Sequence, residues 1–147
     1  GMIEPMSIDV VYTAESPATG GGRDGHGKSW DNRIYLDTRP PKAAGGSGEG
    51  TNPEQLCSAG YAACFLGALR LVSRNDKVSL DDATGVTAQV GFGKDSDGGF
   101  GINAHLIGYL PGLEQSQAEE LMDKAHQVCP YSKATRGNID VTLAAKV

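Results

Sequence analysis

The feature that most limits the fold of this chain is one long apolar helix, which the sequence predicts for residues 51–74. Thr51 or Asn52 can serve as the N-cap, and Glu54 occupies the carboxylate position of a capping box. No charged side chain follows Glu54 until Arg70, and apolar or small residues occupy every face of the helix. This distribution is typical of a buried helix. We therefore expect the rest of the chain to pack around it.

A helix of this length could also cross a membrane, but its first half carries polar side chains at Gln55, Ser58 and Tyr61. Glycine-rich segments flank the helix, and we expect it to be the centre of a soluble domain instead of a membrane span. The net charge is -5 and the sequence has no basic tract, which argues against binding to nucleic acid or to an anionic membrane.

The chain contains three cysteines, Cys57, Cys64 and Cys129. Its first residues lack the apolar run of a signal peptide, so this odd number of thiols indicates a reducing compartment, and we expect a cytoplasmic protein. Cys57 and Cys64 lie two helical turns apart, roughly 10 Å along the axis, which is too far for a disulfide. A redox partner for either must come from elsewhere, and the remaining cysteine is Cys129.

Alternating apolar side chains predict strands before and after the long helix. A glycine-rich segment, residues 14–30, lies between the first two strands and is expected to be a flexible turn region, and residues 38–50 are expected to be a loop. The third and fourth strands read as an antiparallel hairpin across the turn-rich link KDSDGG. The predicted strands are 7–13, 33–37, 86–92, 100–109 and 139–147.

A second helix is predicted to begin at Ser116, with Glu119 as the capping partner. It ends at Cys129, because Pro130 disfavours helical backbone at the residue before it. Together these elements predict one α+β domain, residues 1–147, in which the long helix packs on an antiparallel β-sheet.

The chemistry centres on Cys64, which lies deepest in the apolar helix. Burial raises the pKa of a thiol, so a reactive thiolate there needs a nearby cation. Arg23 can supply that cation from the glycine-rich segment, and Glu54 can hold the guanidinium. Cys129 lies at the end of the second helix beside a proline, and we expect it to be a second thiol that can move.

Each of these residues also has a simpler interpretation. Cys64 can be a small apolar core residue, Glu54 only a capping group, and Arg23 a solvated side chain. His126 and Cys129 form an H-x-x-C pair that could begin a zinc site, but the two cysteines of the long helix are too far apart to complete it easily. We expect no bound metal.

Three motifs give the chain a resemblance to a known family. They are GTNPEQLCSAGYAACF at 50–65, CPYSKATRGNIDV at 129–141 and TGGGRDG at 19–25. In this order and at this separation they resemble the organic hydroperoxide resistance proteins, the Ohr branch of the OsmC/Ohr family, over nearly the whole chain. The resemblance implies an intertwined homodimer with long central helices. It also implies a cysteine-dependent peroxidase that reduces organic hydroperoxides to alcohols.

The resemblance further implies a role for each site residue. Cys64 matches the peroxidatic cysteine, which becomes a sulfenic acid, and Cys129 matches the resolving cysteine, which forms a disulfide with it. Arg23 matches the loop arginine that stabilises the thiolate, and Glu54 the carboxylate that orients it. The family implies no resident cofactor but an external dithiol reductant, a lipoyl group on a lipoylated protein or dihydrolipoamide. Cys57 stands where the family usually has an aromatic residue, and we expect it to be inert.

Two alternative functions stay open at this point. The OsmC branch of the same family also contains peroxidases, and substrate preference would distinguish the two branches. A non-catalytic module that binds a thiol or another ligand could keep the same fold. The motifs TGGGRDG and CPYSKATRGNIDV favour the Ohr branch.

Overall fold

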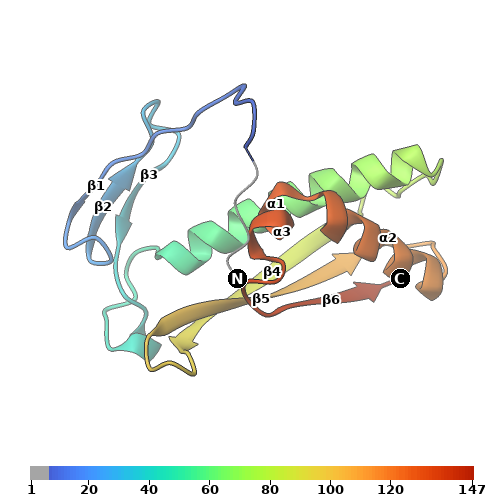
Figure 1. The fold of residues 1–147 in the computed structure, drawn as a ribbon. Coiled ribbons are helices and arrows are strands. Elements are labelled where there is room, and N and C mark those ends of the chain that lie inside the picture. The colour runs from blue at the N-terminus through green and yellow to red at the C-terminus, as the bar shows by residue number, and fades with distance from the viewer. Residues whose placement is uncertain (1–6) are drawn as a thin grey trace. The chain divides into compact units, whose positions relative to one another are not determined.

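The structure, a computed structural model, describes residues 7–147 (Figure 1). The expectation that the chain begins without a signal peptide falls on the first six residues and lies outside this range. The chain separates into two compact units, Gly1–Asn52 and Pro53–Val147, and each is described by itself. The single domain predicted for residues 1–147 stays a prediction.

The first unit holds a three-stranded antiparallel sheet with the strand order β1-β2-β3. β1 and β2 form a hairpin in which Gly20 lies opposite Gly25. β3 confirms the strand expected near residues 33–37, and the loop that follows it contains one turn of 3-10 helix. The elements are β1 (Ala18–Gly20), β2 (Gly25–Lys28), β3 (Tyr35–Thr38) and η1 (Lys42–Ala44).

Two expectations for this unit are wrong. Residues 7–13 form no strand, because a strand needs a hydrogen-bonded neighbour and this segment belongs to neither sheet. Its apolar side chains are instead exposed in the single chain, 79 % for Ile8 and 99 % for Val11. The segment 14–30 is also more than a flexible turn region, since it holds both β1 and β2.

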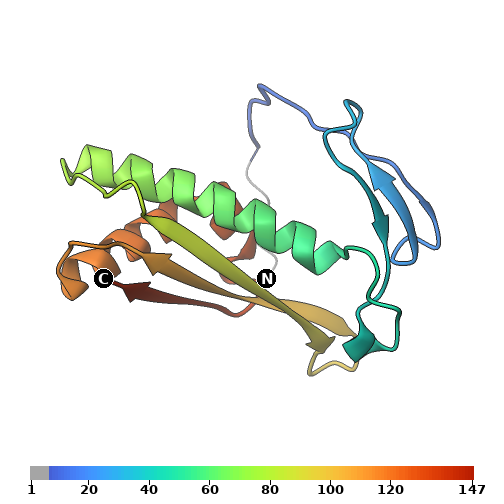
Figure 2. The same ribbon diagram turned by 180° about the vertical axis from the view of Figure 1, so that it is seen from behind.

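The second unit contains a three-stranded sheet with the order β4-β5-β6, and α1 and α2 lie on the same face of it (Figures 1 and 2). β4 and β5 form the antiparallel hairpin that was expected. β6 pairs with β5 in parallel, because the chain crosses back through α2 and α3 before it re-enters the sheet. The α+β class is confirmed. The elements are α1 (Pro53–Asn75), β4 (Gly85–Lys94), β5 (Phe100–Tyr109), α2 (Gln115–Val128), α3 (Pro130–Thr135) and β6 (Val141–Lys146).

α1 confirms the long helix, but within one chain it buries a single face. Tyr61, Phe65 and Leu69 are at most 1 % exposed and belong to the core, whereas Leu56 and Leu71 are 39 % and 45 % exposed. The expectation that every face is buried is therefore wrong for the single chain, because the sheet and α2 cover only one side. By length and composition, α1 is the one helix in the described part of the chain that could cross a membrane. Its buried face packs on β4 and α2.

α2 begins without the capping box expected from Ser116 and Glu119. Its N-cap is Glu114, which makes no side-chain capping bond. Gln115 instead donates from Nε2 to the Glu119 carboxylate at 3.0 Å and to the Ala145 carbonyl at 2.9 Å. The expectation is wrong because the start of α2 is fastened to the neighbouring strand β6 and not capped by its own first turn.

α2 ends at Cys129, as Pro130 predicted. The backbone of Cys129 is extended, with φ -64° and ψ 124°, and a further short helix, α3, starts directly after it. Pro130 occupies the first turn of α3, where its missing N–H costs no hydrogen bond. The same proline therefore stops one helix and starts the next, and the sequence patterns did not indicate the second of these.

Candidate active site

The helices of the second unit bring Cys64 and Cys129 together. Cys64 lies in the middle of α1 and Cys129 at the corner between α2 and α3, and their Sγ atoms are 3.5 Å apart. Both thiols are free in this structure. A disulfide requires about 2.05 Å between the sulfurs, so roughly 1.5 Å of approach separates the two states. The pair can therefore become a disulfide after a small side-chain movement.

Cys129 is held more firmly than its place at a helix end suggested. The residue is 0 % exposed. Its N–H donates to the Ala125 carbonyl at 2.9 Å, and its own carbonyl accepts the Lys133 N–H at 2.9 Å. α3 thus continues the hydrogen bonding that α2 leaves, and the expectation that the Cys129 thiol can move stays a prediction.

The environment of Cys64 does not by itself favour a thiolate. Burial raises the pKa of this thiol above the ordinary value of 9.0, and the neighbouring Cys129 thiol raises it further. The backbone N–H of Tyr131 acts in the opposite direction, because it donates a hydrogen bond to the sulfur and lowers the thiol pKa. A reactive thiolate at Cys64 therefore still needs a positive group.

The Tyr131 N–H is a site group that the sequence interpretation missed. It lies in the first turn of α3, where N–H groups have no partner within the helix and can serve another acceptor. The signal that could have found it is Pro130, since proline is favoured at the first position of a helix.

Cys57, the third thiol, is half-buried two turns before Cys64 on α1. Burial raises the pKa of the Cys57 thiol, and the negative charge of Glu54 raises it further. A raised pKa keeps this thiol protonated at neutral pH and slows its reaction with oxidants. The inert role expected for Cys57 stays a prediction.

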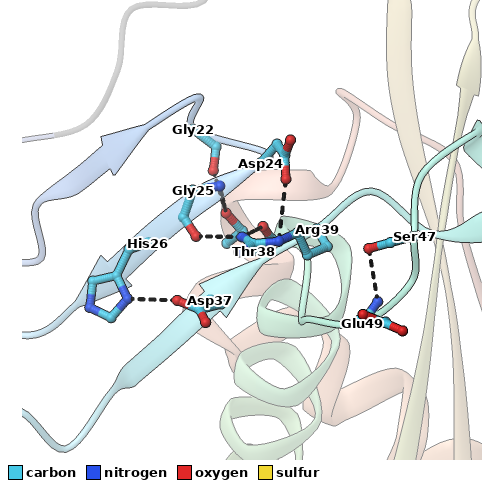
Figure 3. A network of polar contacts seen from close by, with 9 residues as sticks. All are labelled: Gly22, Asp24, Gly25, His26, Asp37, Thr38, Arg39, Ser47 and Glu49. Carbon is cyan, nitrogen blue, oxygen red and sulfur yellow. Dashed lines mark hydrogen bonds and ion pairs between the residues drawn. The ribbon is translucent and has the colours of Figure 1, made fainter.

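Arg23 lies in the first unit, in the turn between β1 and β2. Thr38 of β3 joins two points of this turn: its hydroxyl donates to the Gly22 carbonyl at 2.5 Å and accepts the Gly25 N–H at 2.9 Å (Figure 3). Gly22 has a φ of +74°, which favours glycine, and a side chain at Gly25 would collide with the Thr19 carbonyl. The turn therefore has one defined shape in this structure.

Arg39, directly after β3, holds the same turn through its guanidinium. Nη1 donates to the carbonyls of Gly25 and Thr38 at 3.0 and 2.6 Å, and Nε lies 3.4 Å from the Asp24 carboxylate (Figure 3). Both chain neighbours of Arg23 are thus fastened by side chains at the end of β3. The sequence interpretation missed this pair of contacts, because nothing in the sequence aligns β3 with the turn.

The four predicted site residues are divided between the two units. Arg23 belongs to the first, whereas Glu54, Cys64 and Cys129 belong to the second. The structure brings Cys64 and Cys129 together and places Glu54 in the first turn of α1. The pairing of Arg23 with the Cys64 thiolate, and of Glu54 with Arg23, stays a prediction.

The H-x-x-C pair that suggested zinc has other contacts. His126 directs its Nδ1 to the Ser132 hydroxyl at 2.7 Å. Among residues 7–147, no group of three or more His, Cys, Asp or Glu side chains gathers as a metal site.

Comparison with known proteins decides the family. The family model of OsmC-like proteins matches residues 46–144. The chain belongs to the OsmC-like family. This OsmC-like chain is 50 % identical over 135 residues to an organic hydroperoxide resistance protein of Xanthomonas axonopodis pv. citri, with 91 % of the chain and 94 % of the relative covered. It is 46 % identical over 138 residues to the organic hydroperoxide resistance protein OhrB of Bacillus subtilis, with 93 % and 99 % covered.

Solved structures agree with this assignment. The OsmC-like chain superimposes on an organic hydroperoxide resistance protein from Legionella pneumophila with a TM-score of 0.88 and 45 % identity. The match covers 95 % of this chain and 100 % of the other. The resemblance to the Ohr branch and the expected OsmC/Ohr fold are both confirmed.

Proposed function

We propose that this protein is a thiol-dependent peroxidase that reduces organic hydroperoxides, such as alkyl and fatty-acid hydroperoxides, to alcohols. The observation that carries the proposal is the 3.5 Å distance between the Sγ atoms of Cys64 and Cys129. The names of relatives at 46 % and 50 % identity, which refer to organic hydroperoxide resistance, support the substrate class.

In the first step, the Cys64 thiolate attacks the distal oxygen of the hydroperoxide. An S–O bond forms as the O–O bond breaks, the alkoxide leaves and takes up a proton to become the alcohol, and Cys64 becomes a sulfenic acid. The sulfur gives up two electrons and the hydroperoxide accepts them. In this mechanism Arg23 stabilises the thiolate and the developing alkoxide, and Glu54 orients Arg23.

In the second step, the Cys129 sulfur attacks the sulfenic sulfur of Cys64. An S–S bond forms, the S–O bond breaks, and the oxygen leaves as water. An external dithiol then reopens the disulfide by thiol–disulfide exchange, and we propose a lipoyl group on a lipoylated protein, or dihydrolipoamide, as that dithiol. The cycle uses no resident cofactor. Three free thiols suit a reducing compartment, and a cytoplasmic location is part of the proposal.

The proposed substrates are bulky hydroperoxides in preference to hydrogen peroxide. Cys64 packs against the apolar core, and each CH₂ group of a substrate that becomes buried against apolar side chains beside it contributes about 0.8 kcal/mol. Purified protein should therefore turn over cumene hydroperoxide faster than hydrogen peroxide. Equal turnover would contradict this preference and would favour the OsmC branch over the Ohr branch.

The proposed working form is an intertwined homodimer. Within one chain, Val11 and Tyr12 are 99 % and 69 % exposed, and α1 leaves Leu56 and Leu71 partly exposed as well. A second copy of the chain could cover exposed apolar side chains in either unit, and burial of apolar area contributes roughly 25 cal/mol per Å². Light scattering at micromolar protein concentration should give the mass of two chains, and the mass of one chain would contradict the dimer.

Intact mass tests the dithiol cycle directly. One equivalent of cumene hydroperoxide added to reduced protein should remove two hydrogen atoms, and Cys64→Ser should abolish both this loss and all turnover. Cys129→Ser should stop at the sulfenic acid, gain one oxygen and then oxidise further. Cys57→Ser is the matched control and should behave like the unchanged protein. An unchanged mass in the unsubstituted protein would show a module that binds without catalysis.

A further inference from the structure

A buried hydroxyl on α1 is bonded to α3, the helix that begins directly after Cys129. The Tyr61 Oη lies 2.8 Å from the Ser132 Oγ and 2.9 Å from the Thr135 Oγ1. Tyr61 is 1 % exposed and Ser132 is 0 % exposed. Hydrogen bonds between such groups are costly to lose, because no water can replace the missing partner.

The same network reaches α2. Ser132 Oγ lies 2.7 Å from the Nδ1 of His126, and Arg136 donates from Nη1 to the His126 carbonyl at 2.6 Å. Burial, together with the positive charge of Arg136, lowers the pKa of His126, against the opposing charge of Asp123. A neutral imidazole can therefore serve Ser132 as donor or as acceptor at neutral pH. The hydroxyl of Ser132 thus links all three helices.

Two residues of this network lie one helical turn from the two cysteines along the chain. Tyr61 precedes Cys64 by one turn of α1, and Ser132 follows Cys129 by one turn of α3, so each polar group neighbours its cysteine on the helix. Gly60 allows α3 to approach this closely, because a Cβ there would stand 2.9 Å from the Tyr131 hydroxyl.

We propose that Tyr61 is a positioning residue whose hydroxyl sets the spacing between α1 and the Cys129 corner, and thereby the rate of disulfide formation. This inference rests on the proposed peroxidase function and deepens it. A hydrogen bond fixes the relative position of two helices at one point, because it has narrow limits of distance and angle. A disulfide also forms only within a narrow range of distances and angles between the two cysteines. A displacement of one cysteine by about 1 Å is enough to slow the reaction between them.

The test is Tyr61→Phe, which removes the hydroxyl and keeps the ring. Rapid-quench mass spectrometry should follow two rates, the gain of oxygen at Cys64 and the later loss of water as the disulfide forms. We expect the first rate to change less than about twofold and the second to fall about tenfold, the factor that corresponds to about 1.4 kcal/mol for the lost hydrogen bonds of a buried hydroxyl. Under excess hydroperoxide, a larger fraction of Cys64 should reach the sulfinic acid.

Thr135 supplies a second and milder pair of variants. Thr135→Val removes one of the two partners of Tyr61 and should slow disulfide formation less than Tyr61→Phe does. Thr135→Ser keeps the hydroxyl and should restore the rate. Tyr109→Phe removes the hydroxyl of a half-exposed tyrosine at the end of β5 and is the matched control for the loss of a tyrosine oxygen.

Three results would overturn the inference: disulfide formation at the unchanged rate in Tyr61→Phe, equal slowing of both rates, or equal rates in the two Thr135 variants. Equal slowing would indicate that Tyr61 supports only the fold, and a thermal melt of each variant would show it. Failure of the peroxidase proposal looks different, because the unsubstituted protein would then form no disulfide at all.

Discussion

The two units of the chain are ordered by different forces. In Pro53–Val147 a continuous apolar core holds the helices on the sheet, and Phe65, Leu69 and Leu106 are 0 % exposed. In the first unit, from residue 7 to residue 52, the buried residues are Ser29 and Thr38, and both are polar. The second unit can therefore hold its shape by its own packing, whereas the first depends on hydrogen bonds and leaves apolar surface for another partner.

This difference matters for the proposed chemistry. The two sulfurs lie in the unit with the apolar core, where Cys129 is fully buried and fastened at both sides of its backbone. Arg23 lies in the other unit, on a turn that is held by Thr38 and Arg39. The proposed nucleophile is thus in the unit with the apolar core, and the cation proposed to activate it is on a turn that a few polar contacts define.

The largest expected effect is on the core. Phe65→Ala should lower the free energy of unfolding by about 3–5 kcal/mol, because it removes a large buried ring and leaves a cavity. Trp30→Ala, at a residue 50 % exposed in the first unit, should cost less than about 1 kcal/mol at low protein concentration. Urea unfolding, repeated at several protein concentrations, measures the loss of stability in both variants. Equal losses of unfolding free energy in the two variants at the lowest protein concentration would contradict the difference between the two units. A loss for Trp30→Ala that grows with protein concentration would identify Trp30 as a residue covered by a second copy.

Next in size is the removal of the proposed cation. Arg23→Ala should raise the pKa of the Cys64 thiol, because burial already raises it and the compensating charge is lost. At pH 7 the rate of alkylation and of the first peroxidase step should fall about tenfold or more. The pH dependence of iodoacetamide labelling, with Cys57 and Cys129 both changed to Ser, gives this pKa. Arg33→Ala is the control, since Arg33 is an exposed arginine of the same unit paired with Asp31.

A smaller effect should follow from loosening the turn itself. Thr38→Val removes the hydroxyl that bonds Gly22 and Gly25, and it should lower the free energy of local opening by about 0.5–1.5 kcal/mol. Hydrogen exchange at the Gly25 N–H measures this opening. Thr38→Ser keeps the hydroxyl and should exchange nearly as slowly as the unchanged protein. Unaltered exchange in Thr38→Val would mean that other contacts define the turn.

The smallest effect concerns pH. Burial lowers the pKa of His126 below its ordinary value of 6.5, so between the folded and ordinary values the unfolded chain binds more protons than the folded one. His126 therefore leaves stability unchanged above about pH 6.5 and reduces it as the pH falls below that value. His126→Gln should flatten this part of the curve in urea unfolding at pH 5 to 7. His105→Gln, on β5, is the control, and an identical flattening there would contradict the assignment to His126.

Local patterns predicted the elements that depend on local rules. The long helix, the β4–β5 hairpin and the end of α2 at Cys129 follow from apolar periodicity, from turn residues and from the effect of Pro130 on its neighbour. Residue chemistry indicated Cys64 as a candidate thiolate and Cys129 as a second thiol, and the resemblance of three motifs supplied their proposed roles. No spacing rule could have paired Cys64 with Cys129.

Patterns failed where a segment had to find a partner far along the chain. Residues 7–13 have the alternating pattern of a strand but pair with neither sheet. Residues 14–30 are rich in glycine and were predicted to be a turn region, but they form a hairpin whose turn is held by Thr38 and Arg39. The sequence also did not predict that one side of α1 is exposed in the single chain. Apolar composition does not tell whether the surface that covers a helix belongs to the same chain.

The sequence by itself predicted the family, the long helix and the thiols that are proposed to react, because these predictions rest on motifs and on local periodicity. Only the tertiary structure decided that β6 enters the sheet in parallel, that Cys129 is buried at a fixed corner and that its sulfur lies 3.5 Å from that of Cys64. The reason is physical. A contact between residues distant in the chain depends on how whole helices pack. That packing results from many side chains together, and no single residue determines the distance between the two sulfurs.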